Sequence, residues 1–272
     1  MSLPIFHTNI FLFIAFASQI FYAEFISSES KYYDKVKSWC SGAEFDVDSP
    51  YKTKLIQLLN SLPSSAGKSI NNGYFATNKS SDSETIYARF LCRGDTTPDT
   101  CQGCVSTAIS DLPLAKCLSD KSAVIWYGEC MVQYSNKSFQ GIVDEYIHEG
   151  WRNIDHVSSI TDDVNGFMTL AGDTIQNLTS KVNSLGDHTR EGDSKYYLIK
   201  DVAFNSFIRI YTMVQCTPDL NPLDCGRCLN IVVNEMATYC NGYKGGRVLN
   251  PSCYARYETY PYASTAPDLR VC

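Results

Sequence analysis

The stretch IYARFLCRGDTTPDTCQGC, from Ile86 to Cys104, decides the fold because the chain contains a second version of it. From Ile210 to Cys228 the sequence reads IYTMVQCTPDLNPLDCGRC, with the same C-x8-C-x2-C spacing. Cys92 in the first copy and Cys216 in the second are 124 residues apart. Self-similarity at a fixed offset indicates repeated structural units. The chain therefore contains two related units in tandem.

Each copy continues with two more cysteines at nearly the same spacing. The chain has 12 cysteines in 272 residues. Ten of them belong to the repeat: Cys92, Cys101, Cys104, Cys117 and Cys130, then Cys216, Cys225, Cys228, Cys240 and Cys253. Cys40 and Cys272 lie outside it.

The N-terminus indicates export. An apolar run covers Ile10–Ala17, and no charged side chain precedes Glu24. The run is too short to cross a bilayer and is followed by small residues, which predicts a signal peptide over residues 1–23, cleaved after Ala23, with cleavage after Ala17 as the alternative. The alternative is a buried core segment. We find no later apolar stretch of spanning length, so we expect a secreted, extracellular chain without a membrane span after cleavage.

An exported chain uses its thiols in disulfides, because the compartment is oxidising. The Cys101/Cys104 and Cys225/Cys228 pairs could instead form zinc or redox sites. A four-thiolate zinc site needs two such pairs close in sequence, which this spacing does not supply. We therefore expect structural disulfides and no metal or other cofactor.

Charge and sequons fit the same compartment. The formal net charge of −6 argues against nucleic acid or an anionic membrane as a partner. Three Asn-x-Ser/Thr sequons are candidate glycosylation sites, at Asn78, Asn136 and Asn177.

Helical and extended patterns alternate within each unit. Residues 51–62 place four leucines at helical spacing, and Pro63 is expected to end that helix. A second helix is expected five or six residues after the first repeat cysteine, at Thr97-Pro98 and at Asn221-Pro222, where a polar cap precedes a proline. Stretches rich in β-branched and aromatic residues are predicted as strands over 84–92, 123–134 and 247–257. Each unit is thus expected to pack two helices on an antiparallel sheet, an α+β arrangement.

The predicted helices limit the possible bridges. Cys101 and Cys104 lie one turn apart on such a helix, with Ala108 and Leu112 extending the same inward face. Two cysteines in this relation seldom meet the geometry of a disulfide. Each should therefore bond to another segment and anchor the helix twice.

The cysteine core, the phrases IYARFLCRGD and IYTMVQCTPDL, and the closing phrase GGRVLNPSCYARYETYPY together resemble the ginkbilobin-like domain of land plants. This domain is also called the salt-stress response/antifungal domain. Two copies behind a signal peptide resemble plant cysteine-rich repeat secretory proteins. The same tandem is similar to the ectodomains of cysteine-rich receptor-like kinases and plasmodesmata-located proteins.

The resemblance implies a five-stranded antiparallel sheet with two helices in each domain. It also implies a bridge order, which for this chain gives Cys40–Cys117, Cys92–Cys101, Cys104–Cys130, Cys216–Cys225 and Cys228–Cys253. The second unit lacks a cysteine before its core, which leaves Cys240 and Cys272. We expect these two to pair, the alternative being an intermolecular link or a free thiol. The expected divisions are signal peptide 1–23, domain 1 30–138, linker 139–155, domain 2 156–264 and C-terminal tail 265–272.

Catalytic motifs are scarce. The chain has four histidines, and His148 lacks the second histidine at helical spacing that a zinc protease needs. His148 and His156 as metal ligands are less plausible than solvated linker residues. No paired acid and base can be selected from the carboxylates without geometry. We therefore expect a protein that is not an enzyme.

The resemblance also implies a possible sugar site. The antifungal member of the family binds mannose through an asparagine after its first cysteine, an arginine before its last and a glutamate after it. In the first unit these places hold Ser41, Val124 and Ser135, so the site looks absent. In the second unit they hold Arg247 and Glu258, with the asparagine place near Val157. The alternative is that Arg247 and Glu258 form a salt bridge or support the strand.

The sequence therefore predicts a secreted, non-catalytic binding protein of the plant apoplast, related to stress or defence. Its expected partner is an unknown protein receptor or a cell-wall glycan. The alternative function is a mannose-type lectin with antifungal activity through the second domain.

Overall fold

The computed structural model describes residues 33–263, apart from residues 34, 47, 69–72, 82–83, 113–116, 118, 147–148 and 185–195. The predicted signal peptide (1–23), the predicted tail (265–272), His148 and Cys272 lie outside the described residues.

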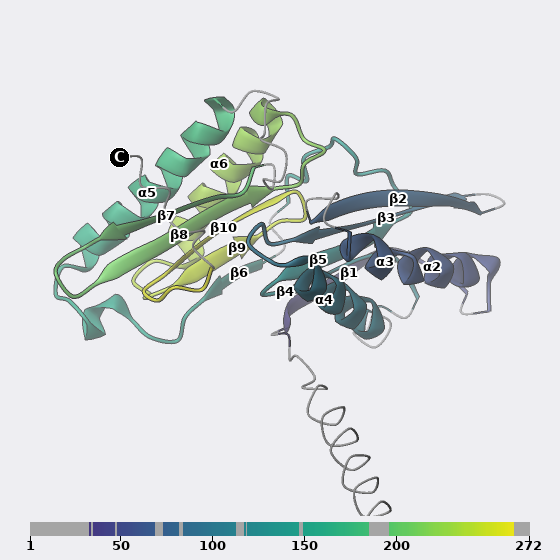
Figure 1. The fold of residues 1–272 in the computed structure, drawn as a ribbon, viewed down its shortest axis with the longest axis horizontal. Helices are drawn as coiled ribbons and strands as arrows, with labels where there is room; N and C mark the ends of the chain where they lie inside the picture. Colours follow the sequence, from purple (N-terminus) through teal and green to yellow (C-terminus); the bar gives the residue numbers. More distant parts are fainter. Residues whose placement is uncertain are drawn as a thin grey trace, which may run out of the picture. The chain divides into compact units, whose positions relative to one another are not determined.

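Domain 1 is built on a five-stranded sheet in which every neighbouring pair is antiparallel (Figure 1). The order across the sheet is β1-β4-β5-β3-β2. The strands are β1 (Lys35–Glu44), β2 (Tyr74–Ser81), β3 (Glu84–Cys92), β4 (Asp120–Tyr127) and β5 (Cys130–Ser135).

Domain 2 repeats this topology with strand order β6-β9-β10-β8-β7. Its neighbouring strands are also all antiparallel. The strands are β6 (Glu149–Arg152), β7 (Leu198–Ala203), β8 (Arg209–Cys216), β9 (Gly246–Leu249) and β10 (Cys253–Glu258). The predicted pair of five-stranded antiparallel sheets is confirmed.

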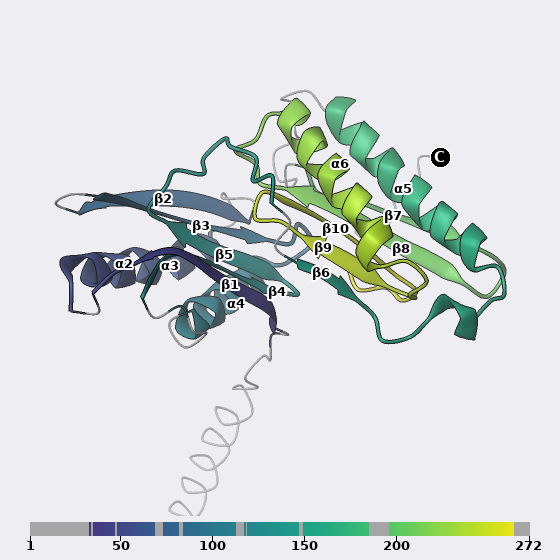
Figure 2. The same ribbon diagram turned by 180° about the vertical axis from the view of Figure 1, so that it is seen from behind.

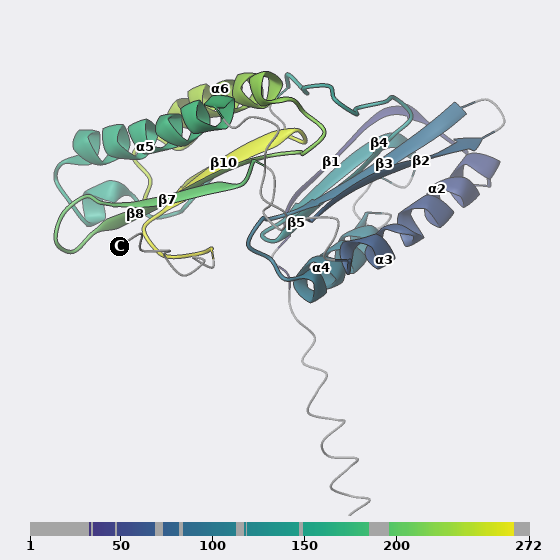
Figure 3. The same cartoon turned by 45° about the horizontal axis from the view of Figure 1, so that its top comes forward.

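Helices cover one face of each sheet, which confirms the α+β class (Figure 3). In domain 2 the two long helices run side by side across the sheet (Figure 2). Domain 1 has α2 (Pro50–Asn60), α3 (Leu62–Ala66) and α4 (Pro98–Asp111); domain 2 has α5 (Val164–Ser184), α6 (Pro222–Tyr239) and the short 3-10 helix η2 (Val157–Ser159).

The repeated helices α4 and α6 begin where the sequence predicts. The Thr97 hydroxyl accepts a hydrogen bond from the Thr100 amide at 3.2 Å, and the Asn221 side chain accepts one from the Asp224 amide at 2.9 Å. In each helix a proline follows the cap, where its missing N–H costs nothing. The inward faces are buried as expected, through Cys101, Cys104, Ala108 and Leu112 in one copy and Cys225, Cys228, Val232 and Met236 in the other.

The prediction that Pro63 ends the first helix is only partly right. α2 ends at Asn60, but Pro63 then lies in the first turn of α3. Proline is tolerated in a first turn because no intrahelical N–H is needed there. The first helix of domain 1 is therefore split, whereas its counterpart α5 is continuous.

Five disulfides brace the described residues and join the same cysteines as the bridge order that the resemblance implies. They are Cys40–Cys117, Cys92–Cys101, Cys104–Cys130, Cys216–Cys225 and Cys228–Cys253. Cys101 and Cys104 bond to different strands, so α4 is anchored to both β3 and β5. The equivalent bridges anchor α6 to β8 and β10.

One strand lies where the sequence predicts linker. β6 falls inside 139–155 and is the edge strand of the second sheet, paired with β9. The second sheet therefore begins before residue 156. The strand is only four residues long, EGWR, and lacks the β-branched residues on which the strand predictions depended.

Buried contacts join the two domains. Leu249 and Tyr254 of domain 2 pack in an apolar cluster with domain 1 residues that include Leu91, Trp126 and Met131. The Gln215 side chain donates a hydrogen bond to the Cys92 carbonyl at 3.0 Å. The tandem therefore packs as one body over the described residues.

Candidate functional site

Each sheet has one face without helices, which we call the helix-free face. On β10 the side chains of Ala255 and Tyr257 belong to the core beneath the helices. Because side chains alternate along a strand, Arg256 and Glu258 lie on the helix-free face. Strand pairing places Arg247 directly opposite Arg256, and therefore on the same face.

The strand register shows which residue of domain 2 stands at the asparagine place of the sugar site that the resemblance implies. In domain 1 Cys40 pairs with Ala123, and in domain 2 Arg152 pairs with Gly246. Gly246 is the repeat equivalent of Ala123, so Arg152 stands where domain 1 has Cys40. The residue that follows is Asn153, the equivalent of Ser41. The expectation that the asparagine place lies near Val157 is therefore wrong, because β6 was not recognised.

Asn153, Glu258 and Gly245 lie together at one end of this face. The Asn153 amide donates to the Gly245 carbonyl at 2.8 Å. A side chain at Gly245 would collide with the carboxylate of Glu258, so glycine permits this close approach. Arg247 follows two residues after Gly245 on the same face. The asparagine, arginine and glutamate are thus brought to one region of the sheet.

Glu258 forms an ion pair with Arg256, its neighbour two residues earlier on the same strand. The Arg256 guanidinium contacts Glu258 Oε1 at 3.0 Å through Nε and at 2.9 Å through Nη2. Glu258 is 6% exposed, and its Oε2 has no hydrogen-bond partner within the part of the chain that the structure describes. The expected alternative, in which Arg247 and Glu258 form a salt bridge or support the strand, stays a prediction, and Arg256 is a partner of Glu258 that the sequence prediction did not include. One carboxylate oxygen remains as an acceptor.

Aromatic side chains hold Arg256 in place. Its guanidinium lies 4.0 Å from the centroid of the Tyr262 ring, and its Nη2 donates to the Tyr260 hydroxyl at 3.2 Å. Burial raises the pKa of Tyr262 well above its usual value, against the opposing effect of Arg256. Sequence reasoning missed Arg256. The sequence could have predicted its contact with Glu258, because residues i and i+2 of a strand share a face.

The position of Arg152 also explains why Cys240 lacks the disulfide partner that its equivalent in domain 1 has. Cys240 is the repeat equivalent of Cys117, whose partner in domain 1 is Cys40. With Arg152 in the partner position, Cys240 is in no disulfide among the described residues and is fully buried. Burial raises the pKa of its thiol to about 11, although Arg152 acts in the opposite direction. Pairing of Cys240 with Cys272 stays a prediction.

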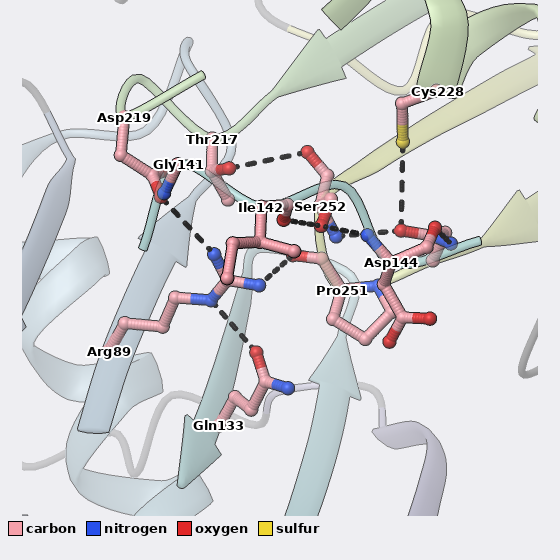
Figure 4. Close-up of polar contacts among 11 residues, drawn as sticks. Arg89, Gln133, Gly141, Ile142, Asp144, Thr217, Asp219, Cys228, Pro251 and Ser252 are labelled. Carbon is pink, nitrogen blue, oxygen red and sulfur yellow. Dashed lines mark hydrogen bonds and ion pairs between the residues drawn. The ribbon is translucent and has the colours of Figure 1, made fainter. Parts of the chain in front are cut away.

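A buried arginine connects the domains (Figure 4). Arg89 of β3 is fully buried and lies 3.7 Å from the Asp219 carboxylate of domain 2. Its Nη2 donates to the Pro251 carbonyl at 3.1 Å, and its Nε donates to Gln133 Oε1 at 2.8 Å. The Phe139 ring lies 4.3 Å from its guanidinium. Burial lowers the pKa of Arg89, an effect that Asp219 opposes.

The sequons occupy different environments. Asn78 on β2 and Asn177 on α5 are exposed, whereas Asn136 is partly buried after β5. Thr179 of the third sequon is fully buried, and its hydroxyl donates to the Ile175 carbonyl at 3.1 Å. All three stay candidate glycosylation sites.

Over the described residues no group of three or more histidine, cysteine, aspartate or glutamate side chains is arranged to hold a metal ion. His156 instead stacks on Tyr243 with ring centroids 4.3 Å apart. No helix in the described part of the chain has both the length and the apolar character needed to cross a membrane.

Comparison with known families identifies the repeat. A family model described as "Salt stress response/antifungal" matches residues 39–137 and 158–260. The chain belongs to this family. The two matched segments correspond to domains 1 and 2, so the salt stress response/antifungal domain is present twice.

Relatives of the family include secreted proteins and receptor kinases. The chain is 31% identical to cysteine-rich repeat secretory protein 38 of Arabidopsis thaliana over 94% of this chain and 96% of that protein. It is 33% identical to an antimicrobial ginkbilobin-2-like protein of Castanea crenata over 84% of this chain and 89% of that protein. It is 36% identical to cysteine-rich receptor-like protein kinase 25 of Arabidopsis thaliana over 80% of this chain but only 31% of the kinase. The chain thus spans about a third of that kinase's length.

Solved structures share the fold. The tandem DUF26 ectodomain of the Arabidopsis thaliana cysteine-rich receptor-like protein PDLP8 matches with a TM-score of 0.66 at 21% identity, over 84% of this chain and 99% of that one. The corresponding ectodomain of PDLP5 matches with a TM-score of 0.63 at 24% identity, over 84% of this chain and all of that one. The tandem salt stress response/antifungal fold is therefore that of receptor-like ectodomains.

Proposed function

We propose that this protein is a secreted, non-catalytic binding protein of the plant apoplast that serves in stress or defence as a protein or cell-wall interaction module. One observation carries the proposal. The two domains form one disulfide-braced body, yet large aromatic side chains remain exposed beside the helix-free faces. Trp39 is 45% exposed, Trp151 45% and Tyr146 80%. Exposed aromatic side chains on a rigid frame favour recognition at low entropic cost.

The relatives support the same assignment. The secretory and antimicrobial proteins are matched over most of their length, and the kinase is matched over less than a third. The matched structures are described as ectodomains. This chain matches only 31% of the length of the receptor-like kinase. We therefore assign to the chain the binding role of an ectodomain and not the catalytic role of a kinase.

Localisation and cell-wall retention test the proposal together. A fluorescent protein fused after residue 272 should mark the apoplast of plasmolysed leaf cells. The purified protein should also sediment with isolated plant or fungal cell walls, and reduction of its disulfides should abolish this retention. Fluorescence confined to the cytoplasm, or equal retention of native and reduced protein, would contradict the proposal.

A second candidate is a mannose-type lectin with antifungal activity through domain 2. The register favours it, since Asn153 takes the place next to Arg247 and Glu258 that the resemblance assigns to an asparagine. The unpartnered Oε2 of Glu258 offers an acceptor, and arginine offers a fork of donors for vicinal hydroxyls. The ion pair of Glu258 with Arg256 weighs against it, because that pair already uses the other carboxylate oxygen.

Calorimetric titration with mannose separates the two candidates. If the lectin candidate is right, mannose binds and both Arg247→Ala and Asn153→Ala weaken the binding. Val124→Ala is the matched control, because Val124 occupies the Arg247 position in domain 1. Absence of mannose binding, or binding unchanged in Arg247→Ala, would remove the lectin candidate and leave the interaction module.

A further inference from the structure

Domain 2 carries a groove on its helical side that none of the sequence predictions used. The groove lies between α5 and α6, which run side by side across the sheet (Figure 2), and Tyr257 of β10 lies beneath it. It holds about 490 Å³ that water-sized groups can occupy. Small-molecule sites have volumes of about 300–1,000 Å³. Because side chains alternate along β10, this groove is on the opposite side of the sheet from Glu258.

Contacts between the two helices bound the groove at one end. The Gln176 side chain of α5 donates to Asn230 Oδ1 of α6 at 3.1 Å. Beyond this bond Gly226 has no side chain to keep Asn183 of α5 away from α6, so the helices approach closely there. The groove is therefore a space of limited length and not an open seam along the whole helix pair.

The helical layer of domain 1 shows which residues open this space. The buried positions of α2 and α3 recur in α5 at a constant offset of 116 residues, so that Tyr51, Leu55, Leu58, Leu59 and Leu62 correspond to Phe167, Ala171, Thr174, Ile175 and Leu178. At the same offset Ile56 corresponds to Gly172. Where domain 1 has a leucine and an isoleucine, domain 2 has an alanine and a glycine.

Nothing else fills the space that these two small residues leave. A Cβ atom at Gly172 would have no neighbouring atom within 4 Å. Glycine weakens a helix interior, and here no close contact requires it. In domain 1 the equivalent of Ala171 is Leu55, which is buried. The groove is thus the result of two missing side chains on one turn of α5.

The floor of the groove is apolar. It is formed by Met168, Ala171, Ile175, Val233 and Met236. Methionine side chains are flexible and adapt to ligands of irregular shape. On α5 the lining extends from Met168 to Gln176, and eight residues of helix rise about 12 Å. The floor therefore suits an elongated apolar body.

The rim of the groove selects against negative charge. Its polar side chains are all exposed: Asp173, Gln176, Asn234 and Asn241. Among the described residues that line the groove none is basic, and Asp173 is acidic. An anionic head group would meet repulsion and no counter-charge. A cationic head group would gain little from Asp173, because water screens an exposed pair. The amides instead pair with uncharged hydroxyl and carbonyl groups.

We propose that this groove binds an uncharged amphiphile, whose apolar chain lies on the floor between α5 and α6 and whose hydroxyl or ester group meets the amides at the rim. The proposal goes beyond the proposed function and does not rest on it, since it concerns a small molecule on the helical side of domain 2. A second copy of this chain laid over the groove would be a different occupant, and the experiment distinguishes the two.

NMR spectra of methionine methyl groups in the secreted full-length protein test the groove. The probe is monodecanoylglycerol below its micelle concentration, with decanoate as the anionic comparison. Met168 and Met236 line the groove, whereas Met131 and Met213 lie between the domains. The first two resonances should shift saturably with the probe and the other two should not. Decanoate should bind about tenfold more weakly, because its charge faces a carboxylate and no cation.

Gly172→Ile gives domain 2 the residue that domain 1 has at this position. The new side chain has room and isoleucine is the better helix former, so the variant should melt no lower than wild type. Its affinity for monodecanoylglycerol should fall about tenfold or more, because the chain loses its apolar floor. Thr169→Ile is the matched control, since it adds the same side chain to an exposed position of α5 outside the groove. Its affinity should stay unchanged.

Several results would overturn the inference. They are the absence of any methionine shift, equal shifts at all four methionines, equal binding of decanoate, and unchanged affinity in Gly172→Ile. A dimer in analytical ultracentrifugation that Gly172→Ile dissociates would also overturn it, because a second copy would then cover the groove. Gly172→Ile should keep its apoplastic localisation and cell-wall retention, so failure of the groove and failure of the proposed function are separate results.

Discussion

Domains 1 and 2 share one strand order and the same helix anchors, but they differ in one crosslink. Both copies tie the repeated helix to two strands, through Cys92–Cys101 and Cys104–Cys130 in domain 1 and their equivalents in domain 2. The Cys40–Cys117 bridge has no counterpart among the residues of domain 2 that the structure describes, because Arg152 takes the place of Cys40 there. The helix anchors are therefore common to the fold, whereas the edge-strand bridge is an addition to it.

The helix-free faces differ more than the cores. The row Trp39, Val124, Gln133 and Arg89 across sheet 1 corresponds to the row Trp151, Arg247, Arg256 and Met213 across sheet 2. Only the tryptophan is common to the two rows. The cores preserve the architecture, and the rows on the helix-free faces, which are mostly buried apart from their tryptophans, give each domain its own chemistry.

Arg89→Met, which places the domain 2 residue in domain 1, should have the largest effect. It leaves Asp219 buried at the interface without its positive partner, and loss of one member of a buried pair costs about 3–5 kcal/mol. Urea unfolding should show this as a lower midpoint. Adding Asp219→Leu should recover most of the loss, because no charge then remains buried. Equal stability of wild type and Arg89→Met would contradict the importance of this contact.

Removal of the edge-strand bridge should cost a comparable amount. Cys40 and Cys117 close a loop of 77 residues, for which chain entropy gives about 4.5 kcal/mol. The Cys40→Ser/Cys117→Ser variant should unfold domain 1 first in calorimetry, as a separate transition below that of domain 2. A single unshifted transition would show that the bridge contributes nothing.

The reverse change should strengthen domain 2. In the Cys272→Ser background, Arg152→Cys places a thiol opposite Cys240 in the register that Cys40 has relative to Cys117, so a disulfide to Cys240 should form. The expected gain is about 2 kcal/mol, since engineered bridges yield less than chain entropy allows. Arg152→Ser is the control that removes the arginine without adding a thiol. Two unreacted thiols in Arg152→Cys would contradict the equivalence of the two positions.

Ionisation of the buried Cys240 thiol should have the smallest effect on stability, and this effect should depend on pH. In Cys272→Ser, Cys240 should resist iodoacetamide until the pH approaches its pKa of about 11, whereas the unfolded thiol reacts near its usual value of 9.0. The folded state keeps its proton to higher pH than the unfolded state does. Stability from this group is therefore complete below pH 9 and falls as the pH rises toward 11. Rapid alkylation of native protein at neutral pH would show that Cys240 is not buried.

Repeat spacing and capping residues were sufficient to predict the architecture. The pairs Thr97-Pro98 and Asn221-Pro222 mark where α4 and α6 begin, because caps and prolines act through local geometry. The sequence did not predict β6, because a strand of four residues is too short to show an alternation of apolar and polar residues. In addition, Arg152 replaces the cysteine that marks the equivalent strand in domain 1. Asn153 was misplaced as a consequence.

The site depended on contacts that no local pattern contains. The pairing of Arg256 with Glu258 follows from strand alternation and could have been predicted. The bond from Arg89 to the Pro251 carbonyl joins residues 162 positions apart and exists only because two domains pack together. The hydrogen bonds from the Asn250 side chain to the Asp144 and Tyr146 carbonyls have the same origin. Such contacts depend on tertiary packing and cannot be inferred from spacing alone.

Peptide mapping of the secreted protein under non-reducing conditions tests most directly whether two separately crosslinked copies of one domain make up this protein. We expect peptides that join Cys40 with Cys117, Cys92 with Cys101, Cys104 with Cys130, Cys216 with Cys225 and Cys228 with Cys253. A bond between a cysteine of the first set and one of the second, or free thiols at these ten positions, would contradict it.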